Sequence, residues 1–77
     1  MVDRGRPEYQ RFREVLRAIR RERGLSQEAL AERLGVRQTW VSLYEVGERR
    51  LDAVEISDIA RALGVSVASI FERAGLD

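Results

Sequence analysis

The 77 residues predict an all-α fold, a compact bundle of five short helices. Apolar residues recur at intervals of three and four in successive segments, as on the buried face of a helix. Glycines follow the ends of these segments, where helices commonly stop. No segment shows the strict alternation that predicts a strand. A chain this short forms one domain, whose core must draw on most of its helices.

The first helix is expected from Pro7 to about Arg23. Proline suits the first position of a helix, where its missing N–H is not needed. Gly24 suits the left-handed residue that follows a helix. The apolar stripe of this helix consists of Phe12, Val15, Leu16 and Ile19. Residues 1–6 are expected to form a flexible N-terminal arm, and residues 7–77 the folded domain.

Two short helices follow, with only a glycine-centred turn between them. Ser26 is a candidate N-cap for a helix over about residues 27–34, which Gly35 ends. The next helix is expected from about residue 37 to residues 44–46. Because the turn is so short, the two helices are expected to cross steeply instead of packing as an antiparallel hairpin.

The last two helices also begin at recognisable caps. Asp52 and Glu55 resemble a capping box at the start of the fourth helix, which Gly64 ends. Ser66 is the candidate N-cap of the fifth helix. The expected apolar stripes are Val54, Ile56, Ile59, Ala60 and Leu63 in the fourth helix, and Val67, Ile70, Phe71 and Ala74 in the fifth.

The composition excludes several classes of function. The chain has no cysteine and no histidine, so thiolate or imidazole metal sites and Cys-His or Ser-His catalysis are ruled out by residue type. We therefore expect no enzyme, no cofactor and no metal site. No segment approaches the roughly 20 apolar residues of a membrane span, and no signal peptide is recognisable, so a cytoplasmic protein is expected.

The charge is distributed unevenly along the chain. The net charge is only +1, but residues 1–25 hold eight arginines against four acidic residues, and residues 51–77 hold two arginines against five. All basic residues are arginine, which can bind phosphate through two hydrogen bonds. A GC-rich genome produces the same preference for arginine over lysine, and we favour that explanation. The chain is therefore basic first and acidic last, and the acidic C-terminal third is expected to face away from any anionic partner.

The third helix is the segment most informative about function. Leu30, Leu34, Val41 and Tyr44 are expected to pack the second and third helices, with Ala31 small where they cross. The outward residues are then Gln38, Thr39, Ser42 and Leu43. Glutamine can pair with the adenine edge, and threonine or leucine can touch a thymine methyl group. Each residue alone could be an ordinary solvated side chain, but the combined pattern favours a helix that enters the DNA major groove.

Two segments, RAIRRERGLSQEALAERLGVRQTWVSLYEVGER and DIARALGVS, resemble the phage repressor and Cro type of helix-turn-helix proteins. The resemblance covers about residues 12–70 and implies that the second and third helices form the DNA-reading unit of a transcriptional regulator. It assigns base reading to the four outward residues above. It implies phosphate contacts for Gln27, Arg37, Arg49 and Arg50, with Arg50 the weaker candidate.

The resemblance also implies a structural ion pair between Arg20 and Glu45, and it has two departures. Leu43 stands where family members often carry a polar residue, so any readout there is apolar or missing. Val46 replaces a frequent asparagine, which weakens one expected backbone contact. The role of Trp40 stays open between core packing and contact with a deoxyribose.

A homodimer is expected, because one such unit reads too few base pairs to find a site in a genome. Its partner is double-stranded DNA, in a pseudo-palindromic operator. We expect Phe71, Leu76 and Leu63 to form the twofold contact. The layout of GERRLDAVEISDIARALGV is most similar to restriction-modification controller proteins, and small phage-type repressors are also similar. An antitoxin or a protein-interaction module of the same fold, whose main partner is a protein, is the alternative.

Overall fold

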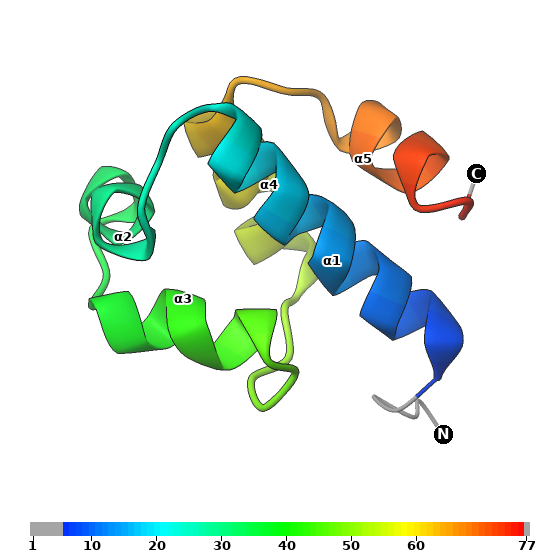
Figure 1. Ribbon diagram of the computed structural model, residues 1–77, viewed down its shortest axis with the longest axis horizontal. Helices are drawn as coiled ribbons and strands as arrows, with labels where there is room; N and C mark the ends of the chain where they lie inside the picture. Colours follow the sequence, from blue (N-terminus) through cyan, green and yellow to red (C-terminus); the bar gives the residue numbers. More distant parts are fainter. Residues whose placement is uncertain (1–5, 77) are drawn as a thin grey trace.

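Five α-helices follow one another through residues 6–76, the part of the chain that this computed structural model describes (Figure 1). They are α1 (Pro7–Glu22), α2 (Gln27–Leu34), α3 (Gln38–Glu45), α4 (Ala53–Leu63) and α5 (Val67–Arg73). The predicted all-α fold of five helices is confirmed, with each helix end within about two residues of its expected position. The expected arm lies outside the described residues except for Arg6, and it stays a prediction.

Hydrogen bonds from side chains explain where three of the helices begin. The hydroxyl oxygens of Ser26 and Ser66 each accept a backbone N–H three residues ahead, at 3.0 Å. Asp52 and Glu55 form a complete capping box, in which each side chain accepts the backbone N–H of the other. Such caps satisfy N–H groups that have no partner within the helix.

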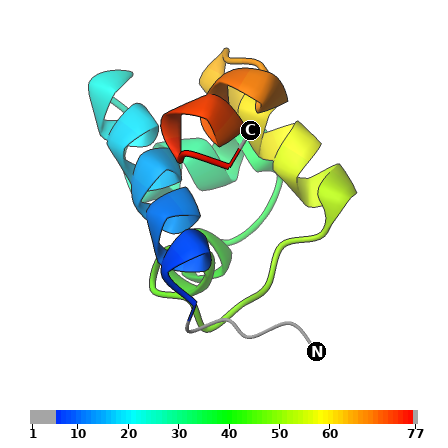
Figure 2. The same cartoon turned by 90° about the vertical axis from the view of Figure 1, so that its right-hand side faces the viewer.

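The helices are arranged so that α3 lies at one edge of the molecule (Figure 1). There α2 is seen almost end-on while α3 is seen lengthwise, so the two cross steeply, as expected. Gly35 makes the turn between them possible because its φ of +72° is unfavourable for other residues. In the second view, α5 lies between α1 and α4, and it contacts both (Figure 2).

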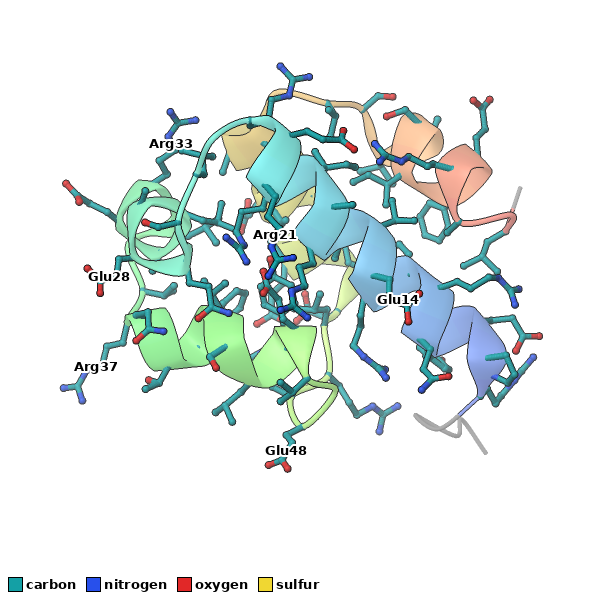
Figure 3. All side chains as sticks on the ribbon, in the orientation of Figure 1. Glu14, Arg21, Glu28, Arg33, Arg37 and Glu48 are labelled. Atoms are coloured by element: carbon teal, nitrogen blue, oxygen red, sulfur yellow. The ribbon has the colours of Figure 1, made fainter. Side chains whose placement is uncertain are left out.

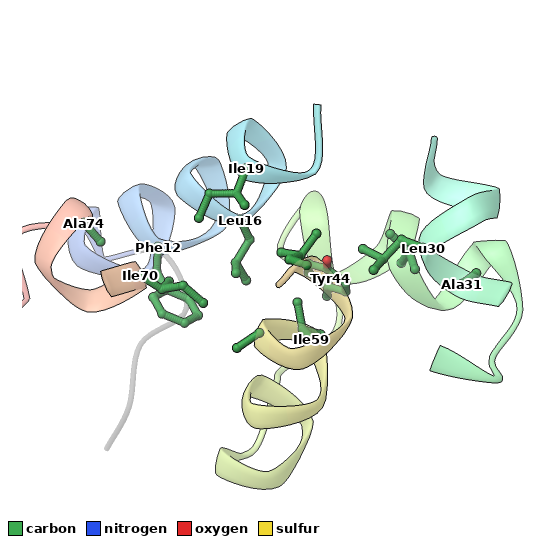
Figure 4. Packing of buried hydrophobic residues seen from close by; sticks show 12 residues of the cluster. Phe12, Leu16, Ile19, Leu30, Ala31, Tyr44, Ile59, Ile70 and Ala74 are labelled. Carbon is green, nitrogen blue, oxygen red and sulfur yellow. The ribbon is translucent and has the colours of Figure 1, made fainter. Parts of the chain in front are cut away.

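Each helix contributes at least one completely buried side chain to a single core (Figure 4). Those with no exposed surface are Leu16, Leu30, Val41, Tyr44, Ile59 and Ile70. Ala31 is also buried, where a larger side chain would hold α2 away from its neighbours. The core therefore fixes α3 from its inner side and leaves its other side outside the bundle.

Two expectations about α4 are wrong. Val54 is 70% exposed instead of lying on the buried stripe. It is two positions from Ile56, which turns it about 200° around the helix. Leu63 is only 2% exposed and is part of the core, so it is not available on the surface for a dimer contact.

No helix among the described residues is long and apolar enough to cross a membrane.

Candidate nucleic-acid interface

The four residues predicted to read bases lie together on the outer side of α3. Gln38, Thr39 and Leu43 are exposed and Ser42 is half-buried. Residues four apart on a helix lie on the same face, which places Gln38 beside Ser42 and Thr39 beside Leu43. We call these four residues the reading face. It carries no formal charge, so it offers hydrogen bonds and apolar contacts.

Behind the reading face lies a buried ion pair between α1 and α3. The guanidinium Nε of Arg20 donates to Glu45 Oε2 at 2.7 Å, and Nη2 donates to Oε1 at 3.2 Å. Their side chains are only 7% and 2% exposed. Arg20 also donates to the carbonyl of Leu25 at 2.8 Å, beyond the end of α1. The ion pair implied by the resemblance is thus present, and it holds the C-terminal end of α3 against α1.

Hydrogen bonds continue from this ion pair to the reading face. The side-chain N–H of Gln27 donates to Glu45 Oε1 at 2.9 Å. The side-chain N–H of Gln38 in turn donates to Gln27 Oε1 at 2.7 Å. The Gln38 amide is therefore oriented by a chain of contacts that starts in the core. The side chain of Gln27 was expected to point at a phosphate, but these bonds turn its oxygen toward α3.

The arginines expected at the flanks differ in how they are held. Arg37 extends from the N-terminal end of α3 away from the helices, and Glu48 extends from the loop after α3 (Figure 3). Arg37 and Arg50 are exposed, and neither side chain forms an ion pair within residues 6–76. Both can reach an anionic partner without giving up an internal contact.

Arg49 is engaged within the chain instead. Its guanidinium donates to both carboxylate oxygens of Glu55, at 3.2 and 2.8 Å, and to the carbonyl of Arg50 at 2.8 Å. These hydrogen bonds lower the pKa of Glu55 and raise the pKa of Arg49. Since Glu55 also closes the capping box with Asp52, this pair fixes the loop to the start of α4.

Trp40 has a packing role. Its ring meets the ring of Tyr44 edge-to-face, with centroids 5.5 Å apart. The guanidinium of Arg49 lies over the Trp40 ring, 4.5 Å from its centroid. A cation in this position is attracted by the ring's π electrons. Trp40 thus joins α3 to the Arg49–Glu55 pair and holds the loop beside the reading face.

A groove of about 450 Å³ opens beside this loop, and Arg49 and Arg50 are among the residues that line it. It is lined by residues from α1, α4, the loop after α3 and the C-terminal region, and its apolar side chains are Phe12, Leu51, Ile56, Phe71 and Leu76. The rings of Phe71 and Phe12 are in contact, with centroids 5.2 Å apart. Two of the residues predicted for a dimer contact therefore lie in one apolar groove.

Sequence reasoning missed how Arg49 and Glu55 pair. Glu55 was recognised only as a helix cap, and Arg49 only as a flanking cation. Their spacing of six residues across a loop gives no periodic signal, because the contact depends on the path of the loop. The link from Gln27 to Gln38 was also missed, although two amides near a steep helix crossing are natural hydrogen-bond partners.

Comparison with known proteins identifies the family. The family model for helix-turn-helix proteins matches residues 16–70. This chain belongs to the helix-turn-helix family of transcriptional regulators. The match includes all of α2, α3 and α4 and parts of α1 and α5.

Two curated relatives are regulators or control proteins. The chain is 42% identical over 48 residues to an uncharacterized HTH-type transcriptional regulator, y4dJ, of Sinorhizobium fredii. That match covers 62% of each protein, so the chain spans less than two thirds of this relative. It is 32% identical over 62 residues to the control protein C.MunI of a Mycoplasma species, covering 79% of this chain and 84% of the relative.

Solved structures agree with the family. An XRE-family-like protein from Pseudomonas syringae superposes with a TM-score of 0.82 and 35% identity, over 88% of this chain and 83% of the other. The clp gene regulator ClgR of Corynebacterium glutamicum superposes with a TM-score of 0.80 and 27% identity, over 86% of both chains. The proteins that this helix-turn-helix chain resembles are regulators of transcription and not enzymes.

Proposed function

We propose that this helix-turn-helix protein is a sequence-specific transcriptional regulator that binds a pseudo-palindromic operator in double-stranded DNA as a homodimer. The observation that carries the proposal is the hydrogen-bonded chain behind Gln38. A reading side chain that is already oriented loses little conformational freedom on binding, which favours specific recognition. The control protein C.MunI, with 32% identity, supports a controller-type regulator.

Base recognition is assigned to the reading face. Gln38 keeps its side-chain oxygen and its second N–H available while one N–H bonds Gln27. An amide with one acceptor and one donor matches the N6 and N7 atoms of adenine in the major groove. Thr39, Ser42 and Leu43 lie beside it and would meet neighbouring base pairs.

Phosphate contacts are assigned to the flanks of this face. Arg37 and Arg50 supply exposed cations, and the first backbone N–H groups of α2 at Gln27 supply donors at the positive end of a helix. Arg49 would act differently, because a phosphate must compete with Glu55 for its guanidinium. We therefore assign Arg49 mainly to holding the loop, with any phosphate contact secondary.

The test is a selection of bound duplexes from a random pool, followed by anisotropy titrations of the selected sequence. A pseudo-palindrome is expected, with log affinity falling linearly as log salt rises. Gln38→Ala should weaken binding by about 1–3 kcal/mol. Gln10→Ala, which changes an exposed glutamine of α1, is the matched control and should bind as the wild type does. Equal affinities of both variants for the selected sequence would contradict base reading by Gln38.

The dimer contact is assigned to the apolar groove that contains Phe71 and Leu76. An apolar groove on a small domain gains stability when a second copy excludes water from it. A pseudo-palindromic operator requires the two reading faces of a dimer to lie about 34 Å apart, one turn of duplex. The third residue predicted for the twofold contact, Leu63, is excluded because it is buried in the core.

Sedimentation of the DNA-free protein tests this contact. Phe71→Ala should shift the mass from dimer to monomer, with its helical circular dichroism retained. Leu76→Ala provides a second variant in case the first perturbs the contact with Phe12. Val54→Ala removes an exposed valine outside the groove and should leave the mass unchanged. An unchanged dimer in both groove variants would remove the groove from the interface.

A further inference from the structure

The groove beside the loop after α3 has two chemically different ends. In Figure 2, α5 lies at the top of this side of the molecule and the loop after α3 lies at the bottom. Toward α5 the lining is apolar, because the rings of Phe12 and Phe71 lie 5.2 Å apart and Leu76 also lines the groove. Toward the loop the lining carries cations, which include Arg49 and Arg50. The groove is therefore amphipathic along its length.

Arginines dominate the charge of this groove. The charged residues of its lining are four arginines and one glutamate, Arg6, Arg13, Arg49, Arg50 and Glu8. The guanidinium of Arg13 lies at the loop end, because a Cβ added to Gly47 would be 2.7 Å from its Cζ. Arg50 is exposed and forms no ion pair within residues 6–76. Together with Arg49, three arginines therefore line the loop end of the groove.

A second copy of the chain does not account for these arginines. In a twofold contact both copies contribute the same surface, so each copy would bring the same arginine-rich lining. Like charges repel each other more strongly where water is partly excluded. A second copy can cover Phe71 and Leu76 at the apolar end, but the partner that suits the loop end is an anion.

We propose that this groove binds a small amphipathic carboxylate, a medium-chain fatty acid in kind, in competition with the second copy. Its carboxylate would lie at the loop end and accept hydrogen bonds from Arg50, since guanidinium groups match carboxylates in shape and charge. Its apolar chain would lie against Phe12, Ile56 and Phe71, which line the groove. The volume of about 450 Å³ is within the range of about 300–1,000 Å³ that small-molecule sites occupy.

Such a ligand would regulate the protein, and this part of the inference rests on the proposed function. The proposed dimer covers the same apolar end of the groove, at Phe71 and Leu76. A ligand that binds only the separate copies shifts the equilibrium toward monomer. Operator affinity would then fall as the carboxylate concentration rises, with no additional sensor domain.

Calorimetric titration of the DNA-free protein with octanoate tests the site. Saturable binding to a single site per chain is expected. Octanol has the same chain length but no charge, and it should bind at least about fivefold more weakly. Arg50→Ala should weaken octanoate binding by about fivefold, which corresponds to ~1 kcal/mol for an exposed ion pair. Arg37→Ala, which removes an exposed arginine outside the groove, is the matched control and should bind as the wild type does.

The apolar end and the competition need separate measurements. Leu76→Ala should weaken the binding of octanoate and octanol alike, because it shortens the apolar lining that both would contact. In sedimentation of the wild type, saturating octanoate should shift the mass from dimer to monomer. Operator affinity measured by anisotropy should fall over the same range of octanoate concentration.

Three outcomes would overturn this inference. One is the absence of saturable octanoate binding, which would leave the second copy as the occupant of the groove. Another is equal binding of octanoate and octanol that Arg50→Ala does not change, since the arginines would then have no role. The third is octanoate bound to an intact dimer. Selection of an operator is measured without octanoate, so its failure would overturn the proposed function and leave the carboxylate site standing.

Discussion

Replacing Glu45 with alanine should destabilise the domain severely, because Glu45 is the centre of the buried hydrogen-bond chain. Its carboxylate accepts two hydrogen bonds from Arg20 and one from Gln27. Its side chain is 2% exposed and that of Arg20 is 7% exposed, so water cannot easily replace the lost contacts. The Glu45→Ala variant therefore leaves a buried guanidinium with only the carbonyl of Leu25 as a partner.

The expected loss follows from that unpaired charge. Removing one partner of a buried ion pair costs about 3–5 kcal/mol. A domain of 77 residues has a total stability of about 4–12 kcal/mol. Glu45→Ala should therefore remove a large fraction of the free energy of unfolding, and part of the population should be unfolded at room temperature if the wild type lies at the low end.

Urea denaturation followed by far-ultraviolet circular dichroism measures this loss. The matched control is Asp58→Ala on α4. Oδ1 of Asp58 lies 3.5 Å from Nη1 of Arg61, and the side chains of Asp58 and Arg61 are 51% and 77% exposed. That variant should change stability by no more than about 0.5 kcal/mol. A double variant, Arg20→Met with Glu45→Leu, should recover most of the stability because no charge is left buried. If Glu45→Ala lost no more stability than Asp58→Ala, burial of the pair would not carry the energy assigned to it.

Three further predictions concern stability. The hydroxyl of Tyr44 is buried and has no hydrogen-bond partner among residues 6–76, and burial raises its pKa. Tyr44→Phe should therefore stabilise the domain by about 1 kcal/mol in urea denaturation, and a loss of stability would reveal a partner for the hydroxyl. Gly47→Ala and Gly35→Ala should each cost about 1–2 kcal/mol in urea denaturation, because their φ angles are +87° and +72°. The Cβ added at Gly47 would lie 2.7 Å from Cζ of Arg13, but the end of that flexible side chain can move away, so the two losses should be similar. A much larger loss at Gly47 would show that Arg13 is held in place. The hydrogen bonds from the Arg49 guanidinium lower the pKa of the Glu55 carboxyl from its usual 4.5, so this contact stabilises the folded state above that pH and is lost as the pH falls. Glu55→Gln should therefore show a smaller fall in melting temperature below pH 4.5 than the wild type. Parallel curves of melting temperature against pH for the two proteins would contradict this contribution.

The positions of the helices along the chain follow from local features of the amino-acid sequence. Ser26 and Ser66 cap the helices that follow them, and the Asp52 capping box starts α4. Gly35 and Gly64 end helices in the left-handed conformation. These features are local, since each depends on residues within one or two turns of the chain. For the same reason the reading face could be predicted: the spacing of buried residues in α3 fixes which residues face outward.

Contacts between side chains of different helices could be found only in the folded structure. Arg49 could equally have been a free cation, but the path of the loop brings it to Glu55 and over Trp40. Gln27 is bonded to Gln38 because the steep crossing of α2 and α3 brings the side chains of their first residues together. These contacts depend on distances between separate elements, which helical periodicity does not encode.

The same distinction explains the error at Leu63. Its position in an apolar stripe left open whether it would pack inside one domain or against a second copy. Packing of α4 in the common core buried it, whereas Phe71 and Leu76 remain in a groove on the surface. An apolar stripe in the sequence indicates that one face of the helix is buried, and the arrangement of the neighbouring helices determines what covers that face.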